Sequence, residues 1–355
     1  MTTQAELPEV ATRYRICGLT LASEIRLPEL AEAAGADLAQ APDIRFRLEQ
    51  AAPGRTLQGC GITVFALPTG EPGLECAREP GGYRLRFPGL ADFRVDIRGC
   101  EVVCEAPEGT PPATVRHLLL DQVIPRALSL RGVHALHATA VLTPHGICAF
   151  AGPAGAGKST LAASFHLAGH PVLSDDCLVL QEETGAILVT PAYPGVRLWD
   201  DAAAALLGSR RDALPSTRHI SKLRVLEGSH AGSLPPHRRT LARIYNIVDP
   251  PETESGAKGR IVEAIPDREA FMSLITSVYR LDVTDRTVLA RQFEFCERVA
   301  SLVPVRNLRV PEDFSALPAV RDAIFADLRM TNMSRNSALE SEHRSEATVS
   351  AREAP

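Results

Sequence analysis

A glycine-rich octapeptide near the middle of the chain has the residue types and spacing that bind the phosphates of a nucleotide. It fits the pattern G-x-x-x-x-G-K-[ST] at every fixed position. Glycines let backbone N–H groups curl around phosphate oxygens, and a following helix presents its positive end to the anion. The lysine can contact the β and γ phosphates, and the serine hydroxyl can ligate Mg²⁺. The expected ligands are therefore ATP and Mg²⁺, and the expected binding residues are Gly152, Pro153, Ala154, Gly155, Ala156, Gly157, Lys158, Ser159 and the adjacent Thr160.

An acidic pair follows this loop at the end of the next predicted strand. Asp175 and Asp176 close the segment Pro171-Val-Leu-Ser-Asp-Asp. A carboxylate at the C-terminal end of a strand beside a phosphate-binding loop is where a metal-holding aspartate is expected. Adjacent strand residues point to opposite faces, so one carboxylate could take the metal while the other faces elsewhere. The alternative is an aspartate pair that only starts a turn.

Two histidines and one arginine are further candidates. His134 and His137 lie in the apolar stretch before the loop, where a histidine is more often a core residue than a catalytic one. Arg197 could bind phosphate oxygens bidentately through its guanidinium group, or could simply be a surface arginine on a strand. The basic cluster from Arg218 to Arg224 could be a mobile loop that meets nucleotide or acceptor, or a solvated charge run.

The elements that must position these residues alternate along the chain. Apolar segments predict strands at Ala135–Val141 and Gly146–Phe150, and the second leads into the loop. Helical periodicity then runs from Lys158 to Leu167 and ends at Gly169, a suitable C-cap. The order strand, loop, helix, strand predicts an α/β fold.

The flanking segments complete the predicted organisation. Short alternating segments from Tyr14 to about Cys104 predict a β-rich unit whose strand arginines form a solvated face, with a binding surface as the alternative. Helices are predicted at Pro111–Ser129, kinked at Pro125, and at Arg286–Leu302 and Leu317–Leu328. We expect a β-rich N-terminal domain at 1–110, a catalytic domain at 111–330, and a disordered tail at 331–355, which is poor in aliphatic residues.

Composition narrows the function classes. The 355-residue chain is 45% hydrophobic and 23% charged, as in soluble globular proteins, and its length suits two domains. A net charge of −5 without a long basic run argues against nucleic-acid binding. No run of 18 apolar residues predicts a membrane span, and the cysteine spacings favour neither disulfides nor zinc. A cytoplasmic location is expected.

In these residues the chain resembles the C-terminal catalytic domain of HPr kinase/phosphorylase. The shared layout is a histidine in a strand (His137), the loop at Gly152–Ser159, a helix that ends in Gly169-His170, and a strand that ends in Asp175-Asp176. The resemblance covers about fifty residues. It implies a P-loop kinase fold related to phosphoenolpyruvate carboxykinase, which phosphorylates a protein serine.

The resemblance also implies roles for individual residues. Lys158 would contact the phosphates, Ser159 would bind Mg²⁺, and His137 would lie near the transferred phosphate. Asp175 would be the general base on the acceptor hydroxyl, and Asp176 would hold metal or orient that base. The roles of the two aspartates could be exchanged.

The chain departs from the family at three places. Thr160 stands where the family usually has Glu, Pro194-Gly-Val-Arg-Leu-Trp199 replaces the Arg-Gly-Leu-Gly signature, and the N-terminal unit differs. These departures count against HPr as the substrate and against a phosphorylase activity.

The whole-chain layout resembles HPr-kinase-like proteins of peptide natural-product pathways, including kinases that phosphorylate the C-terminal serine of lasso-peptide precursors. The expected partner is then a peptide or protein with a serine hydroxyl, and a homo-oligomer is left open. The alternatives are a small-molecule hydroxyl kinase and a nucleotide-gated binding protein without transfer activity.

Overall fold

The computed structural model describes residues 11–51, 60–66, 70–193, 195–208, 222–225, 239–248 and 260–330. At residue 60 and residues 222–225 only the backbone is described. Three predicted features lie outside the described residues: Pro194, the side chains of the basic cluster Arg218 to Arg224, and the tail at 331–355.

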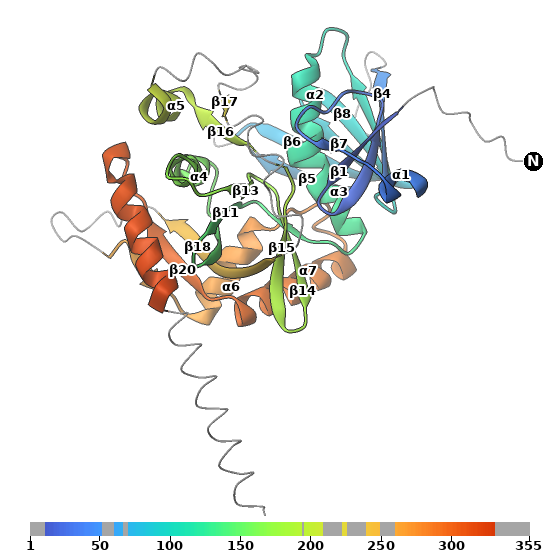
Figure 1. The fold of residues 1–355 in the computed structure, drawn as a ribbon. Helices are drawn as coiled ribbons and strands as arrows, with labels where there is room; N and C mark the ends of the chain where they lie inside the picture. The colour runs from blue at the N-terminus through green and yellow to red at the C-terminus, as the bar shows by residue number, and fades with distance from the viewer. Residues whose placement is uncertain are drawn as a thin grey trace, which may run out of the picture.

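The N-terminal part of the chain forms a nine-stranded sheet with the order β3-β1-β2-β4-β9-β8-β7-β6-β5 (Figure 1). Strand β4 is parallel to both of its neighbours, and the other neighbouring pairs are antiparallel. The short helix α1 (Ala36–Ala39) lies between β3 and β4 in sequence. The strands are β1 (Thr12–Ile16), β2 (Leu19–Ser23), β3 (Ala31–Glu32), β4 (Ile44–Gln50), β5 (Cys60–Ala66), β6 (Pro72–Glu79), β7 (Gly82–Phe87), β8 (Ala91–Asp96) and β9 (Glu101–Ala106).

The strand arginines do not form the uniformly solvated face that their alternation predicts. Arg84 is only 1% exposed, and its guanidinium contacts Glu79 at 2.6 Å and Glu105 at 2.8 Å. Arg94, on the next strand, also contacts Glu105 at 2.8 Å and remains 40% exposed. The prediction is wrong for Arg84 because the carboxylates of Glu79 on β6 and Glu105 on β9 neutralise the guanidinium and allow it to be buried.

The helix after this sheet changes its winding before Pro125. The segment consists of α2 (Pro112–Leu118), a π-helical turn (Leu119–Val123) and α3 (Ile124–Leu130). A proline lacks the N–H that would bond four residues back and clashes with the carbonyl there, which belongs to Asp121. Where the sequence predicts a kink at Pro125, the structure shows a widened turn on the N-terminal side of this proline.

The second sheet carries the glycine-rich loop Gly152–Ser159 at the end of one of its strands. Its order is β10-β14-β15-β18-β12-β11-β13, with β20 beside β18 and β19 beside β20. Strand β12 leads into the loop and lies between antiparallel β11 and parallel β18. The strands are β10 (Ala135–Leu136), β11 (Thr139–Thr143), β12 (Gly146–Ala151), β13 (Val172–Ser174), β14 (Leu178–Glu183), β15 (Ala186–Thr190), β18 (Arg239–Val248), β19 (Val262–Ala264) and β20 (Val305–Arg309).

One predicted strand is divided in the structure. The segment Ala135–Val141 forms the whole of β10 and the start of β11, and His137 lies in the bend between them. The backbone N–H of His137 donates to Ser277 O at 2.7 Å, and β10 pairs with β14 while β11 pairs with β12. His137 is therefore at a bend between two strands, and its prediction as a strand residue is wrong.

Helices cover both faces of the second sheet (Figure 1). On one face, α4 (Lys158–Leu167), α5 (Asp200–Leu207) and a helix at residues 317–330 share a buried apolar cluster with β12 and β18. On the other face, α6 (Asp267–Ser277) and α7 (Arg286–Leu302) share a second cluster. A short 3-10 turn (Phe314–Ala316) and a hairpin of β16 (Val196–Trp199) and β17 (Lys222–Val225) complete the described elements. The structure confirms a mixed α/β fold, and the domain boundaries stay a prediction.

Within the described residues, no helix is both long and apolar enough to cross a membrane.

Candidate functional site

The glycine-rich loop connects the end of a central strand to the start of a helix. Strand β12 ends at Ala151 and α4 begins at Lys158. Gly152 has φ 138°, and a Cβ placed on it would lie 2.9 Å from Ile247 O on the neighbouring strand β18. Only glycine fits this position without a shift of the backbone. The structure therefore gives a steric reason for glycine at position 152, in addition to the phosphate contact that the sequence predicts.

Lys158 is folded back over the loop. Lys158 is 5% exposed, and its Nζ donates to Gly152 O at 2.8 Å and to Pro153 O at 2.9 Å. The ammonium therefore lies at the start of the loop, within reach of groups that the loop would surround. Pro153, Ala154 and Gly155 are exposed, so the loop is open to solvent on that side.

Asp175 lies next to the first residues of α4. Its Oδ1 accepts hydrogen bonds from Ser159 Oγ at 3.0 Å and from Thr139 Oγ1 at 2.6 Å, and its Oδ2 accepts from the backbone N–H of Arg197 at 3.0 Å. Burial, with the charge of Asp176, raises the pKa of Asp175 to about 7, although the three hydrogen bonds act to lower it. The carboxylate is therefore buried, and a cation bound beside it would favour its ionised form.

Asp176 faces a different set of groups. It has φ 63°, which is uncommon for a residue with a side chain, and Tyr279 Oη donates to its carbonyl at 2.8 Å. His137 Nδ1 lies 3.9 Å from Asp176 Oδ1 and 3.2 Å from Tyr279 Oη. Burial raises the pKa of Tyr279, so its hydroxyl stays a donor. The predicted strand ends one residue earlier, at Ser174, and both aspartates lie in the bend that follows β13. They point to different neighbours because the backbone of Asp176 is left-handed, and not because they alternate along a strand.

The other predicted residues have distinct surroundings. The Arg197 side chain forms an ion pair with Asp121, and its predicted grip on phosphate stays a prediction. Thr160 is partly buried in the first turn of α4. His134 is buried with its ring centroid 5.0 Å from that of Phe295, and burial lowers its pKa. His134 is thus a core histidine, the interpretation that its apolar surroundings favour.

The structure adds site residues that the sequence does not single out. Thr139 and Tyr279 contact the acidic pair from distant parts of the chain, and neither residue belongs to a recognisable motif. The sequence gives a weak indication of a role for Asp121, because it is an acid in an apolar helical segment, four residues after His117 and four before Pro125. In the structure its side chain is buried.

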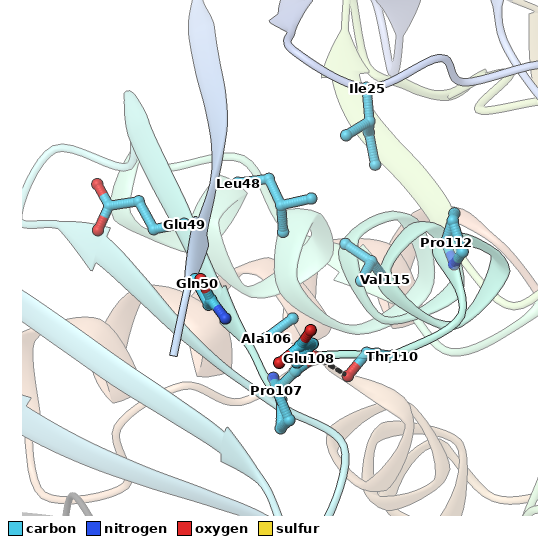
Figure 2. Close-up of a pocket in the computed structure, with 10 residues that line it drawn as sticks. All are labelled: Ile25, Leu48, Glu49, Gln50, Ala106, Pro107, Glu108, Thr110, Pro112 and Val115. Atoms are coloured by element: carbon cyan, nitrogen blue, oxygen red, sulfur yellow. Dashed lines mark hydrogen bonds between the residues drawn. The ribbon is translucent and has the colours of Figure 1, made fainter. Parts of the chain in front are cut away.

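A cavity of about 510 Å³ lies apart from these residues, between the end of β4, the end of β9 and the start of α2 (Figure 2). None of the predicted site residues lines it. Its lining is Ile25, Leu48, Glu49, Gln50, Ala106, Pro107, Glu108, Thr110, Pro112 and Val115. The candidate nucleotide site is therefore defined by the loop and its neighbours and not by this cavity.

Among the residues that the structure describes, no three His, Cys, Asp or Glu side chains are grouped to hold a metal ion. A magnesium ion that bridges phosphates does not need such a group, because it takes one or two protein carboxylates and keeps several waters. The oxygen pair of Ser159 and Asp175 fits that requirement.

No family model and no curated protein matches the chain. Among solved structures, the HPr(Ser) kinase/phosphatase from Coxiella burnetii matches with 13% sequence identity and a TM-score of 0.30. The match covers 56% of this chain and 98% of that one. Because the TM-score is this low, the function must be argued from the site.

Proposed function

We propose that this protein is an ATP-dependent kinase that transfers the γ-phosphate to a serine hydroxyl of a peptide or protein. The observation that carries the proposal is the hydrogen bond of 3.0 Å between Ser159 Oγ and Asp175 Oδ1. It joins the serine that follows the loop lysine to an acid directly after β13, which is separated from the loop strand β12 by β11. P-loop nucleotide-hydrolysing proteins hold Mg²⁺ with such a pair.

The contacts favour an exchange of the roles first assigned to the two aspartates. The resemblance gives the base role to Asp175 and the metal role to Ser159 and Asp176. Both carboxylate oxygens of Asp175 accept hydrogen bonds, one of them from Ser159 itself. Ser159 and Asp175 would therefore hold Mg²⁺, which supplies positive charge to the β and γ phosphate oxygens when bound.

Asp176 then becomes the proposed base. Its side chain is 14% exposed, and it lies beside His137 instead of Ser159. The hydrogen bond from Tyr279 to its carbonyl fixes the unusual backbone that directs the carboxylate away from the metal pair. Asp176 would accept the proton of the serine hydroxyl, and Lys158 would neutralise the transferred phosphate. Such catalysis consists mostly of positioning and electrostatic stabilisation.

The acceptor class is the finer part of the proposal. The β-rich N-terminal unit favours a peptide or protein, because a small acceptor needs no additional docking surface. The C-terminal serine of a lasso-peptide precursor is the specific acceptor that the whole-chain resemblance suggests. A small-molecule kinase and a nucleotide-gated binding protein are the alternatives.

The experiment uses ATP labelled on the γ-phosphate with Mg²⁺ and three sets of samples: peptides that end in serine, a metabolite pool, and no acceptor. The kinase proposal expects label on a peptide. Label on a metabolite would support the small-molecule alternative. Hydrolysis without any labelled acceptor in peptides, metabolites or lysate would support the nucleotide-gated alternative.

Variants of the acidic pair test the exchanged roles. Asp176→Asn is expected to stop transfer while Mg²⁺-dependent ATP binding remains. Asp175→Asn is expected to weaken the Mg²⁺ dependence of binding itself. The exposed acid Asp201, in the first turn of α5, offers Asp201→Asn as a control. Near-normal transfer by Asp176→Asn would show that the exchanged assignment is wrong.

A further inference from the structure

A buried ion pair connects the helix before the catalytic sheet to the hairpin beside the candidate site. Asp121 lies on the π-helical turn with a side chain that is 0% exposed, and Arg197 lies on β16 with a side chain that is 16% exposed. Their charged groups are in direct contact. His117 Nδ1 lies 2.6 Å from Asp121 Oδ2 and 2.6 Å from Arg197 Nη1, so the three side chains form one cluster.

Arg197 also contacts Asp175, through its backbone. While its guanidinium binds Asp121, its N–H donates to Asp175 Oδ2 at 3.0 Å. The other oxygen of Asp175 accepts from Ser159. One residue therefore joins two buried carboxylates, and the second of them is the proposed partner of the metal.

Asp121 is held in place because its helical turn packs against the N-terminal sheet. Asp121 lies on the π-helical turn, four residues before Pro125 in the sequence. The nearby residues Leu118, Leu119 and Val123 pack into the apolar cluster of the N-terminal sheet. The hairpin strand β16 lies against α4, whose first turn carries Ser159. Strand β16 is thus held at Arg197 by two contacts, one from the guanidinium to Asp121 and one from the backbone N–H to Asp175.

The energetics indicate a positioning function rather than simple stabilisation. Burial of two charges costs free energy that their attraction often only offsets, whereas an apolar pair of similar size would be as stable. Groups that hydrogen-bond to a metal ligand orient it, and their loss commonly weakens metal affinity or activity.

We propose that Asp121, His117 and the Arg197 side chain are positioning residues that hold β16 so that its backbone orients Asp175 toward Ser159 and Mg²⁺. This inference rests on the proposed function, because it gives the cluster its effect through the same metal pair. It assigns to the helix after the N-terminal sheet a direct influence on the catalytic site.

The test measures ATP binding to the full chain in the presence and absence of Mg²⁺. Asp121→Asn is expected to raise the Mg²⁺ concentration for half-maximal tightening of ATP binding roughly tenfold. Its affinity for ATP in EDTA should stay that of the unaltered chain, because the loop glycines and Lys158 are unchanged.

A matched control comes from the same helix. Arg116 Nε and Glu29 Oε1 form an ion pair of 3.0 Å with side chains 16% and 9% exposed. It is also partly buried, but it has no contact with Asp175 among the described hydrogen bonds. Glu29→Gln should lower thermal stability and leave the Mg²⁺ requirement unchanged, which separates positioning from general destabilisation.

A second pair of variants keeps the test decisive if Asp121→Asn does not fold. Arg197→Ala should raise the Mg²⁺ concentration that ATP binding requires. Arg197→Lys, which keeps a positive charge opposite Asp121, should raise it less. Equal Mg²⁺ requirements for Asp121→Asn and Glu29→Gln, or for Arg197→Ala and the unaltered chain, would overturn the inference.

If the unaltered chain binds ATP with Mg²⁺ but transfers no phosphate, only the proposed kinase activity fails. If its ATP binding does not depend on Mg²⁺, both proposals fail.

Discussion

At the scale of single residues, the site depends on how two adjacent carboxylates are separated. Asp175 is buried and accepts from Ser159 and Thr139, whereas Asp176 has a left-handed backbone held by Tyr279. The pair itself and the loop serine can be recognised in the sequence. Thr139 and Tyr279 cannot, because tertiary packing alone brings them there from 36 and 103 residues away.

The raised pKa of Asp175 predicts how stability depends on pH. An unfolded aspartate has a pKa of about 3.9, and the folded protein raises the pKa of Asp175 to about 7. The folded chain binds this proton more tightly, so this carboxyl lowers the free energy of unfolding as pH rises between these values. In metal-free buffer, Asp175→Asn should therefore gain thermal stability relative to the unaltered chain as pH rises through that window.

Thermal denaturation in EDTA across that pH range checks this prediction. Asp201→Asn serves again as the control, because Asp201 is exposed and should show no such trend. A stability difference that grows as the solution is acidified would contradict it.

The steric position of Gly152 predicts a second effect. Gly152→Ala would place a Cβ 2.9 Å from Ile247 O at φ 138°, which should lower the free energy of unfolding by roughly 1–3 kcal/mol. Gly155 also has a positive φ, 87°, but a Cβ there meets no atom within 4 Å. Urea denaturation should therefore show a smaller loss for Gly155→Ala. Equal losses would mean that the contact with β18 is unimportant.

At the scale of elements, local patterns succeed where the local sequence decides the conformation. Helix α7 begins and ends at the predicted residues Arg286 and Leu302, and Asp285 caps it by accepting from two backbone N–H groups. The division of Ala135–Val141 into β10 and β11 was not predictable in this way. It depends on the bond between His137 and Ser277 and on two separate strand partners.

The end of α4 provides a prediction at this scale. Gly169 has φ 88°, its N–H donates to His166 O, and the N–H of His170 donates to Phe165 O. This is the Schellman arrangement that glycine favours. Gly169→Ala should cost roughly 1 kcal/mol of unfolding free energy, and Gly169→Asn less, because Asn tolerates this conformation better. Chemical denaturation measures both, and an equal cost would contradict the account.

At the scale of the whole molecule, the helix before the second sheet joins the two parts of the chain. The apolar cluster that contains Phe46 and Phe93 of the N-terminal sheet also contains Leu119, Cys177 and Tyr279. The expectation of a β-rich unit followed by an α/β unit follows from periodicity. Their shared core does not, because periodicity identifies apolar faces without identifying what covers them.

This shared core predicts the behaviour of a shortened chain. A fragment without residues 1–110 would expose the apolar side chains of α2 and the π-helical turn that now pack on the sheet. We expect it to aggregate or to melt well below the full chain in thermal denaturation and light scattering. A monomeric fragment with the melting temperature of the full chain would show that the two parts are independent.

The most direct test of the central claim follows the γ-phosphate. The full chain is incubated with γ-labelled ATP, Mg²⁺ and peptides that end in serine, beside Lys158→Ala and Asp176→Asn. The account predicts labelled serine with the unaltered chain and none with either variant, while Asp176→Asn still binds ATP in the presence of Mg²⁺. Unchanged labelling by Lys158→Ala, or hydrolysis without a labelled acceptor by the unaltered chain, would contradict it.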